Sequence, residues 1–278
     1  MNIRLGVGVI SVVMLVASCS TSPSSAPNSL ETMPLTSAYN QAYSDNYEVD
    51  TIEEIILNAR HSYVLLDPFS GQDLSGYIEE IKANDNEVSA YISVGTGEVW
   101  RADYYELQEF LVGKEWGDWA GEYFVNQTNT GIVEVMMKRI DQIAEMGFDW
   151  VEFDNMDWAF DDRSRAAYGF EVTVEESIAY YEDLCAYAKG KGLKCMAKSL
   201  SRGIDGFDGA TFESSSEEKN WWSEADLLDF IAEGDKLVLI VHYDETECDE
   251  VYEYYLDLYG EGILFITEDT STEKYRHY

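Results

Sequence analysis

The sequence predicts an α/β domain of the (β/α)8, or TIM, barrel class, and three observations support this. Short apolar runs rich in β-branched and aromatic residues alternate along the chain with stretches of helical periodicity. There are eight such runs, the number that a closed barrel requires. The part of the chain that carries them has about 230 residues, enough for one barrel domain. An open doubly wound sheet is the alternative.

The predicted strands are apolar runs bounded by polar residues. They cover residues 39–43, the weakest of the set, and 63–67, 88–94, 150–154, 194–199, 209–213, 236–242 and 262–267. Helices are predicted over residues 51–58, 74–83, 131–146, 173–191, 223–232 and 248–259. The helix at 131–146 has an apolar stripe suited to covering a sheet, formed by Ile132, Val135, Met136, Ile140, Ile143 and Ala144.

Residues 1–19 are interpreted as a lipoprotein signal peptide. Arg4 precedes an apolar run, and Val-Ala-Ser-Cys19 places small residues directly before a cysteine, which resembles the lipobox of bacterial lipoproteins. Cys19 would then carry the lipid. An ordinary signal peptide is the alternative. A transmembrane helix is disfavoured, because the apolar run is too short to span a membrane.

Residues 20–36 are rich in Ser, Thr and Pro and are predicted to be a flexible tether, so that residues 37–278 form the barrel domain. Ser20 follows Cys19, a pairing that resembles export to the outer membrane in Gram-negative lipoproteins. We therefore expect a protein of the bacterial cell envelope, in the outer membrane or at the cell surface, that touches the membrane only through its lipid.

The charge of the chain excludes several classes of partner. It has 54 acidic and 18 basic residues and a formal net charge of -36, so nucleic acid phosphates and acidic membranes would repel it. A cationic substrate or a salty habitat fits this charge. The hydrophobic fraction of 46% is ample for a packed core, and we expect a monomer.

Beyond Cys19 there are three cysteines. Cys185 and Cys195 could pair, but their spacing leaves this open, and buried unpaired cysteines are the alternative.

Polar residues end several of the predicted strands, at the face where barrel enzymes keep their chemistry. They are Asp67, Asp154 with Asn155 and Asp157, Lys198, Glu213, and His242 with Tyr243. Converging acids suit hydrolysis of a glycosidic bond, which needs one carboxylic acid and a second carboxylate as nucleophile or base. Asp154 and Glu213 are the predicted pair. The long connection from residue 95 to 130 is dense in Trp and Tyr, which would stack on sugars or pack the connection onto the barrel.

Each of these residues also has a simpler interpretation. Glu213 opens an acidic stretch that could be a solvated loop, and Lys198 more readily neutralises nearby acids than forms a Schiff base. His242 could be structural or could contact substrate. Asp157 with Asp161 and Asp162 could hold calcium, although an exposed acidic loop is the preferred interpretation. We predict no metal and no cofactor, because the three histidines are far apart and no cysteine pattern suits zinc.

Several motifs, in order, resemble the blocks of glycoside hydrolase family 114, which has a TIM-barrel fold and includes endo-α-1,4-polygalactosaminidases. They are Tyr91-Ile-Ser-Val-Gly-Thr-Gly-Glu98-Val-Trp100-Arg101, Trp119-Ala-Gly-Glu122, Arg139-Ile-Asp141, Val151-Glu-Phe-Asp154-Asn155-Met-Asp157, Gly169-Phe170 and Ala197-Lys198. The resemblance covers residues 39–267.

The resemblance implies an enzyme that cuts galactosamine-rich polysaccharide, with Asp154 and Glu213 as catalytic acids. It also implies that Tyr91, Arg101, Asn155, Asp157 and Lys198 line the pocket, and we add Asp67, Glu98, Trp100, His242 and Tyr243 as expected substrate contacts. Ser70 and His242 stand where the family carries acids. These departures leave open an alternative function, that of a non-catalytic lipoprotein that binds carbohydrate at the surface.

Overall fold

The computed structural model describes residues 34–42, 49–116, 119–156, 160, 165, 171–215, 219, 221–243, 247–268 and 275–278. The chain divides into two compact units, Met1–Met33 and Pro34–Tyr278, and all described residues belong to the second. The predicted signal peptide, Cys19, most of the predicted tether and Asp157 lie outside the described residues.

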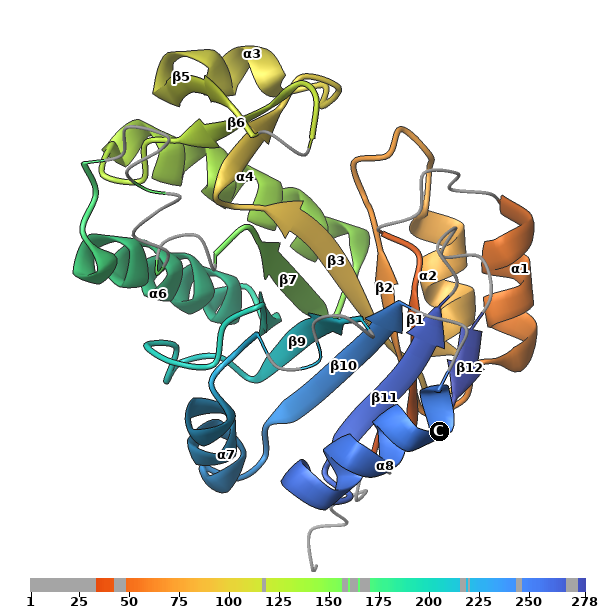
Figure 1. Cartoon of the computed structure of the whole chain (residues 1–278). Coiled ribbons are helices and arrows are strands. Elements are labelled where there is room, and N and C mark those ends of the chain that lie inside the picture. Colours follow the sequence, from red (N-terminus) through yellow and green to blue (C-terminus); the bar gives the residue numbers. More distant parts are fainter. Residues whose placement is uncertain are drawn as a thin grey trace, which may run out of the picture. The chain divides into compact units, whose positions relative to one another are not determined.

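The described strands form a nearly closed barrel, as predicted (Figure 1). Eight of them follow one another in chain order and pair in parallel: β1 (Ser37–Asn40), β2 (Ser62–Leu66), β3 (Glu87–Ser93), β7 (Trp150–Asp154), β8 (Lys194–Lys198), β9 (Gly209–Ser214), β10 (Leu237–Tyr243) and β11 (Ile263–Glu268). β1 also contacts β11, which brings the two ends of the series together. A short ninth strand, β12 (Tyr275–His277), pairs antiparallel with β11 and was not predicted.

The predicted helices are present within one or two residues of their expected ends. They are α1 (Val49–Asn58), α2 (Ser75–Lys82), α4 (Thr130–Met146), α6 (Val174–Gly190), α7 (Glu224–Ala232) and α8 (Cys248–Tyr259). Local signals set their ends. A capping box between Thr173 and Glu176 starts α6, and Gly147 ends α4 in the left-handed conformation (φ 88°) that glycine adopts at little cost.

Strand alternation divides the apolar residues into two packed layers. Within the barrel lie Tyr63, Leu65, Tyr91, Trp150, Met196, Leu239, Val241 and others. Between the sheet and the helices lie the residues that alternate with them, such as Val64, Ala90 and Ile92, packed against the apolar faces of α2 and α4. This alternation decides which strand residues can reach the barrel interior and its rim.

The connection between β3 and α4 is not a plain loop. It folds into a small antiparallel sheet of order β4-β6-β5, formed by β4 (Thr96–Glu98), β5 (Leu111–Glu115) and β6 (Glu122–Val125), with α3 (Tyr104–Leu107) and a 3-10 turn (Gln108–Phe110) between β4 and β5. Its aromatic residues differ in exposure: Trp116 packs on Phe124 (ring centroids 4.9 Å apart), whereas Trp100, Tyr105 and Trp119 are exposed. This small sheet brings acidic residues to the rim of the barrel.

A disulfide joins Cys185 of α6 to Cys195 of β8, with their Cα atoms 5.8 Å apart. It settles the pairing that spacing left open, and Cys248 is a buried free thiol. No helix in the described part of the chain is both long and apolar enough to span a membrane.

Candidate active site

Asp154, Lys198 and Glu213 meet at the carboxyl ends of three adjacent strands. Asp154 is the last residue of β7, Lys198 is the last residue of β8, and Glu213 is the penultimate residue of β9. Because β8 lies between β7 and β9, its lysine stands between the two acids. Lys198 Nζ lies 3.4 Å from Asp154 Oδ1 and 3.2 Å from Glu213 Oε2. The structure thus brings together the three charged residues on which the predicted chemistry depends.

Each acid also accepts a hydrogen bond from a tyrosine, buried in the case of Tyr91 and partly buried in the case of Tyr243. The Tyr91 hydroxyl donates to Asp154 Oδ2 at 2.9 Å, and the Tyr243 hydroxyl donates to Glu213 Oε1 at 2.8 Å. Burial raises the pKa of both tyrosines well above the ordinary value, and the charge of the neighbouring carboxylate raises it further. Both tyrosines therefore remain protonated donors, and each fixes the orientation of its acid.

Lys198 stays charged although it is buried. Its side chain is 10% exposed, and burial alone would lower its pKa. The carboxylates of Asp154 and Glu213 outweigh burial and raise the pKa of Lys198 above the ordinary value. Lys198 therefore serves as a permanent counter-ion to the two acids and is not a neutral amine of the kind a Schiff base requires.

Asn155 connects the small sheet to Asp154. Its backbone N–H donates to Asp154 Oδ1 at 2.7 Å, and its own φ of 59° turns the chain sharply at the end of β7. Its side-chain amide donates to Ser93 Oγ (2.9 Å), Thr96 Oγ1 (3.1 Å) and Glu122 Oε1 (3.0 Å). Asn155 is thus held by the small sheet while it holds Asp154.

Glu122 is the site residue that the strand-end argument missed. It begins β6, is only 6% exposed, and accepts hydrogen bonds from Thr96 and Asn155. Burial, together with the negative charges of Glu98 and Asp154, raises the pKa of Glu122 to about 7. Glu122 belongs to the motif Trp119-Ala-Gly-Glu122, but this motif lies in the long connection after β3, where the sequence predicts no strand end.

Asp67, Glu98 and Arg101 form a buried ion-pair group at the same rim. Arg101 makes a two-pronged contact with Glu98 (Nε to Oε2 2.9 Å, Nη2 to Oε1 2.8 Å) and donates from Nη1 to Asp67 Oδ2 at 2.6 Å. Its guanidinium lies 5.7 Å from the centroid of the Tyr91 ring. These contacts join the end of β2 and β3 to the small sheet. The expected contact of Asp67, Glu98 and Arg101 with substrate stays a prediction.

Two other expected contacts, Trp100 and His242, take no part in these ion pairs. Trp100 is 52% exposed on the turn after β4, where its ring lies beside Gly121, whose φ of 86° and close contact with Val99 leave no room for a side chain. His242 points out of the barrel, because strand alternation turns its neighbour Tyr243 inward.

The expected substrate contact of His242 is therefore corrected. Its side chain is fully buried between β10 and α8, with Nδ1 2.9 Å from Ser214 Oγ. Ser214 Oγ in turn lies 2.6 Å from the Tyr255 hydroxyl of α8. His242 packs in the layer between the sheet and the helices.

Among the residues that the structure describes, no three His, Cys, Asp or Glu side chains are grouped so as to hold a metal ion.

Comparisons with known proteins place this geometry in context. A family model described as "Glycoside-hydrolase family GH114" matches residues 36–277. The structure of Ega3 from Aspergillus fumigatus in complex with galactosamine aligns with a TM-score of 0.67 at 19% identity, covering 88% of this chain and 95% of that one. The glycoside hydrolase domain of PelA from Pseudomonas aeruginosa aligns with a TM-score of 0.61 at 13% identity, covering 86% and 96%. At these identities the structures show a shared fold. No curated protein matches the chain in sequence.

Proposed function

Since the chain belongs to glycoside-hydrolase family GH114 and is a glycoside hydrolase, we propose that it cleaves an α-linked galactosamine-type polysaccharide, with Asp154 and Glu213 as its two catalytic carboxylates. The observation that carries this proposal is the pair of acids on β7 and β9 that flank one ammonium group at the rim. Two carboxylates held at a fixed separation are what hydrolysis of a glycosidic bond requires.

The surroundings of the two acids support different roles for them. Asp154 accepts from the Tyr91 hydroxyl and the Asn155 backbone N–H, lies beside Lys198, and is 14% exposed, so its carboxylate is held in place and largely shielded from water. Glu213 accepts from Tyr243, lies beside Lys198, and is 34% exposed. Asp154 is therefore the nucleophile, and Glu213 is the acid and base.

The separation of the acids favours retention of configuration. Because both lie against the same Nζ, at 3.4 Å and 3.2 Å, Asp154 Oδ1 and Glu213 Oε2 are at most about 6.6 Å apart. This limit lies below nearly all of the range of about 6.5–9.5 Å that inverting glycosidases occupy. Asp154 attacks the anomeric carbon while the bond between that carbon and the leaving oxygen breaks. Glu213 donates a proton to the leaving oxygen. Glu213 then removes a proton from water, which displaces Asp154 from the sugar.

A cationic polymer fits the charge of the protein. The formal net charge of -36 attracts polycations, and the catalytic group of Asp154, Lys198 and Glu213 has two acids against one ammonium. The solved structure of Ega3 contains galactosamine, an amino sugar. The exposed rings of Trp100 and Trp119 on the small sheet offer apolar faces on which sugar rings can stack.

We also propose that the enzyme is anchored to the bacterial envelope through Cys19. The lipobox-like Val-Ala-Ser-Cys19 supports this, and the Cys185–Cys195 disulfide fits an oxidising compartment. In cells given a labelled fatty acid, the wild type should take up label and Cys19→Ala should take up none. Label that remains in Cys19→Ala would refute the anchor.

The activity is tested by release of reducing ends from α-1,4-linked polygalactosamine. The wild type should release them, and Asp154→Asn and Glu213→Gln should lower kcat by about 10³-fold or more. Asp183→Asn, which changes an exposed acid on α6, is the matched control and should keep full activity. Full activity in Asp154→Asn would refute the catalytic assignment. A folded wild type that leaves this polymer intact would refute the substrate.

A further inference from the structure

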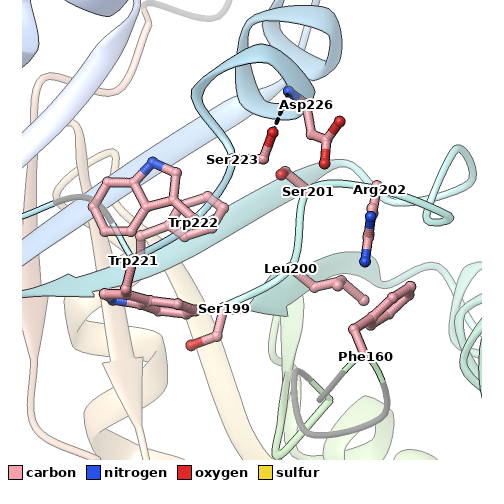
Figure 2. A pocket seen from close by; sticks show the side chains of 10 residues that line it. Phe160, Ser199, Leu200, Ser201, Arg202, Trp221, Trp222, Ser223 and Asp226 are labelled. Carbon is pink, nitrogen blue, oxygen red and sulfur yellow. Dashed lines mark hydrogen bonds between the residues drawn. The ribbon is translucent and has the colours of Figure 1, made fainter. Parts of the chain in front are cut away.

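A cavity beside Glu213 has no part in the reaction proposed above. It measures about 210 Å³ and is lined by the segment after β8, by β9 and by the start of α7 (Figure 2). It lies next to the end of β9, because the indole N–H of Trp221, which lines the cavity, donates to the backbone carbonyl oxygen of Glu213 at 2.7 Å. Pockets for drug-sized ligands measure about 300–1,000 Å³. This cavity is smaller, which suits a single sugar unit.

Trp221 gives the cavity a fixed aromatic wall. Its ring is 42% exposed, yet its indole N–H donates to the Glu213 carbonyl oxygen at 2.7 Å. The ring also meets Trp222 edge to face, with centroids 5.6 Å apart, and Trp222 is buried and donates to the Tyr259 hydroxyl at 3.0 Å. Exposing and ordering a large apolar ring both cost free energy. An exposed indole ring that is held in this way beside a catalytic residue points to a ligand that covers the face of the ring.

The charges of the cavity differ from those of the catalytic group. One guanidinium, that of Arg202, lies opposite Trp221 with its Cζ 4.6 Å from the centroid of the Phe160 ring, and one carboxylate, that of Asp226, lies near Ser223 (Figure 2). These two charges cancel, whereas the acids around Lys198 leave an excess of negative charge. A protonated amine therefore gains less here than at the catalytic group.

A neutral acetamido group matches this lining better than an ammonium does. Arg202 can donate to its carbonyl oxygen, and its methyl group can pack on the apolar side chains of Leu200 and Phe160, which lie together at one end of the cavity (Figure 2). The hydroxyls of Ser199 and Ser201 can bond the sugar hydroxyls. Trp221 supplies the stacking face.

We propose that this cavity binds an N-acetylated sugar unit of the substrate polymer, near the unit whose bond is cut, so that the enzyme prefers partly acetylated chains. This inference rests on the proposed function for the identity of the polymer. The catalytic group takes a cationic unit, and the cavity takes a neutral one. The enzyme would thus recognise a pattern of acetylation along the chain.

The preference is measured as the ratio of kcat/KM on partly N-acetylated polygalactosamine to that on the fully deacetylated polymer. Arg202→Gln and Trp221→Ala should each lower this ratio by about tenfold, the usual effect of losing one such contact. Arg60→Gln, which changes an arginine beyond the end of α1, should keep the ratio within about twofold. An unchanged ratio in both cavity variants would overturn the proposal.

A second measurement tests the cavity without relying on turnover. The indole N–H of Trp221, identified in the nitrogen-15 NMR spectrum by its loss in Trp221→Phe, should shift saturably as N-acetylgalactosamine is added. Galactosamine should bind more weakly, and Arg202→Gln should weaken the binding of N-acetylgalactosamine at least about fivefold. If the wild type cleaves neither polymer yet this shift appears, the substrate proposal fails and the cavity proposal stands. No shift, or an equal shift in Arg202→Gln, would overturn the cavity proposal.

Discussion

Asp154 and Glu213 share one counter-ion although they end strands that are not neighbours in the sheet. Lys198, on the strand between them, lies 3.4 Å from the first and 3.2 Å from the second. The two acids are also alike in that each accepts a hydrogen bond from a tyrosine hydroxyl. The geometry of the pair therefore depends on the lysine between them as much as on the two acids.

Replacing Lys198 with Met should harm both stability and activity. The change leaves two carboxylates at the rim without their counter-ion, and removing one partner of a buried ion pair costs about 3–5 kcal/mol. Without the ammonium group between them, the two carboxylates would also repel each other and lose their fixed separation, so kcat should fall by about 10² or more. Chemical unfolding and initial rates measure the two effects.

Lys191→Met is the matched control for this variant. Lys191 pairs with Asp141 on the surface, at 2.6 Å, with both side chains over a third exposed. Exposed pairs contribute about 0–1 kcal/mol, so this variant should keep its stability and its rate. Equal losses in the two lysine variants would show that the position of Lys198 between the acids has no special effect.

The stereochemistry of the product tests the roles assigned to the acids. If Asp154 is the nucleophile and the acids are as close as their shared lysine requires, cleavage of an α-linked galactosamine oligomer should release the α-anomer first. Proton NMR during the first minutes of reaction, before the product mutarotates, distinguishes the anomers. Initial release of the β-anomer would mean that Asp154 activates water directly, and the nucleophile assignment would be wrong.

Glu122 should make the stability of the protein depend on pH. Its pKa is raised from 4.5 to about 7, so folding favours its protonated form. The contribution of Glu122 to the free energy of unfolding is fully present below about pH 4.5 and is lost as the pH rises through about 7. This loss is on the order of 2 kcal/mol. Glu122→Gln keeps a neutral side chain of the same shape. It should be more stable than the wild type at pH 8 and about equal to it at pH 4.5.

Chemical unfolding at these two pH values measures the effect. Glu134→Gln, on the exposed face of α4, is the control and should follow the wild type at both. If Glu122→Gln loses as much stability between pH 4.5 and pH 8 as the wild type does, the pH dependence comes from other groups.

The sequence predicted the barrel well because its elements have strong local signals. The parallel strands are buried on both faces and so appear as continuous apolar runs, and caps such as Thr173 and Gly147 mark the helix ends. Asp154, Lys198 and Glu213 could be grouped because the carboxyl ends of parallel strands share one face of the barrel. His242 was misplaced because adjacent strand residues point in opposite directions, and the apolar run alone does not say which of two neighbours faces inward.

Glu122 and the small sheet were missed for a related reason. Strands β4, β5 and β6 are short, and they depend on their packing against one another for stability, so local patterns carry little information about them. The contact of Glu122 with Asn155 joins residues 33 positions apart in the sequence, and no local pattern predicts it.

The disulfide between α6 and β8 should stabilise the domain by limiting its unfolded states. Closing a loop between residues 10 positions apart contributes about 2–3 kcal/mol in the chain-entropy view. The Cys185→Ala, Cys195→Ala double variant should lose about this much in chemical unfolding, and a reductant should lower the stability of the wild type but leave that of the double variant unchanged. Cys248→Ala, which removes the buried free thiol, should stay sensitive to the reductant. A wild type whose stability is the same with and without the reductant, and whose Cys185 and Cys195 are both alkylated after unfolding without it, would contradict the bond, because the two thiols would then be free in the folded protein.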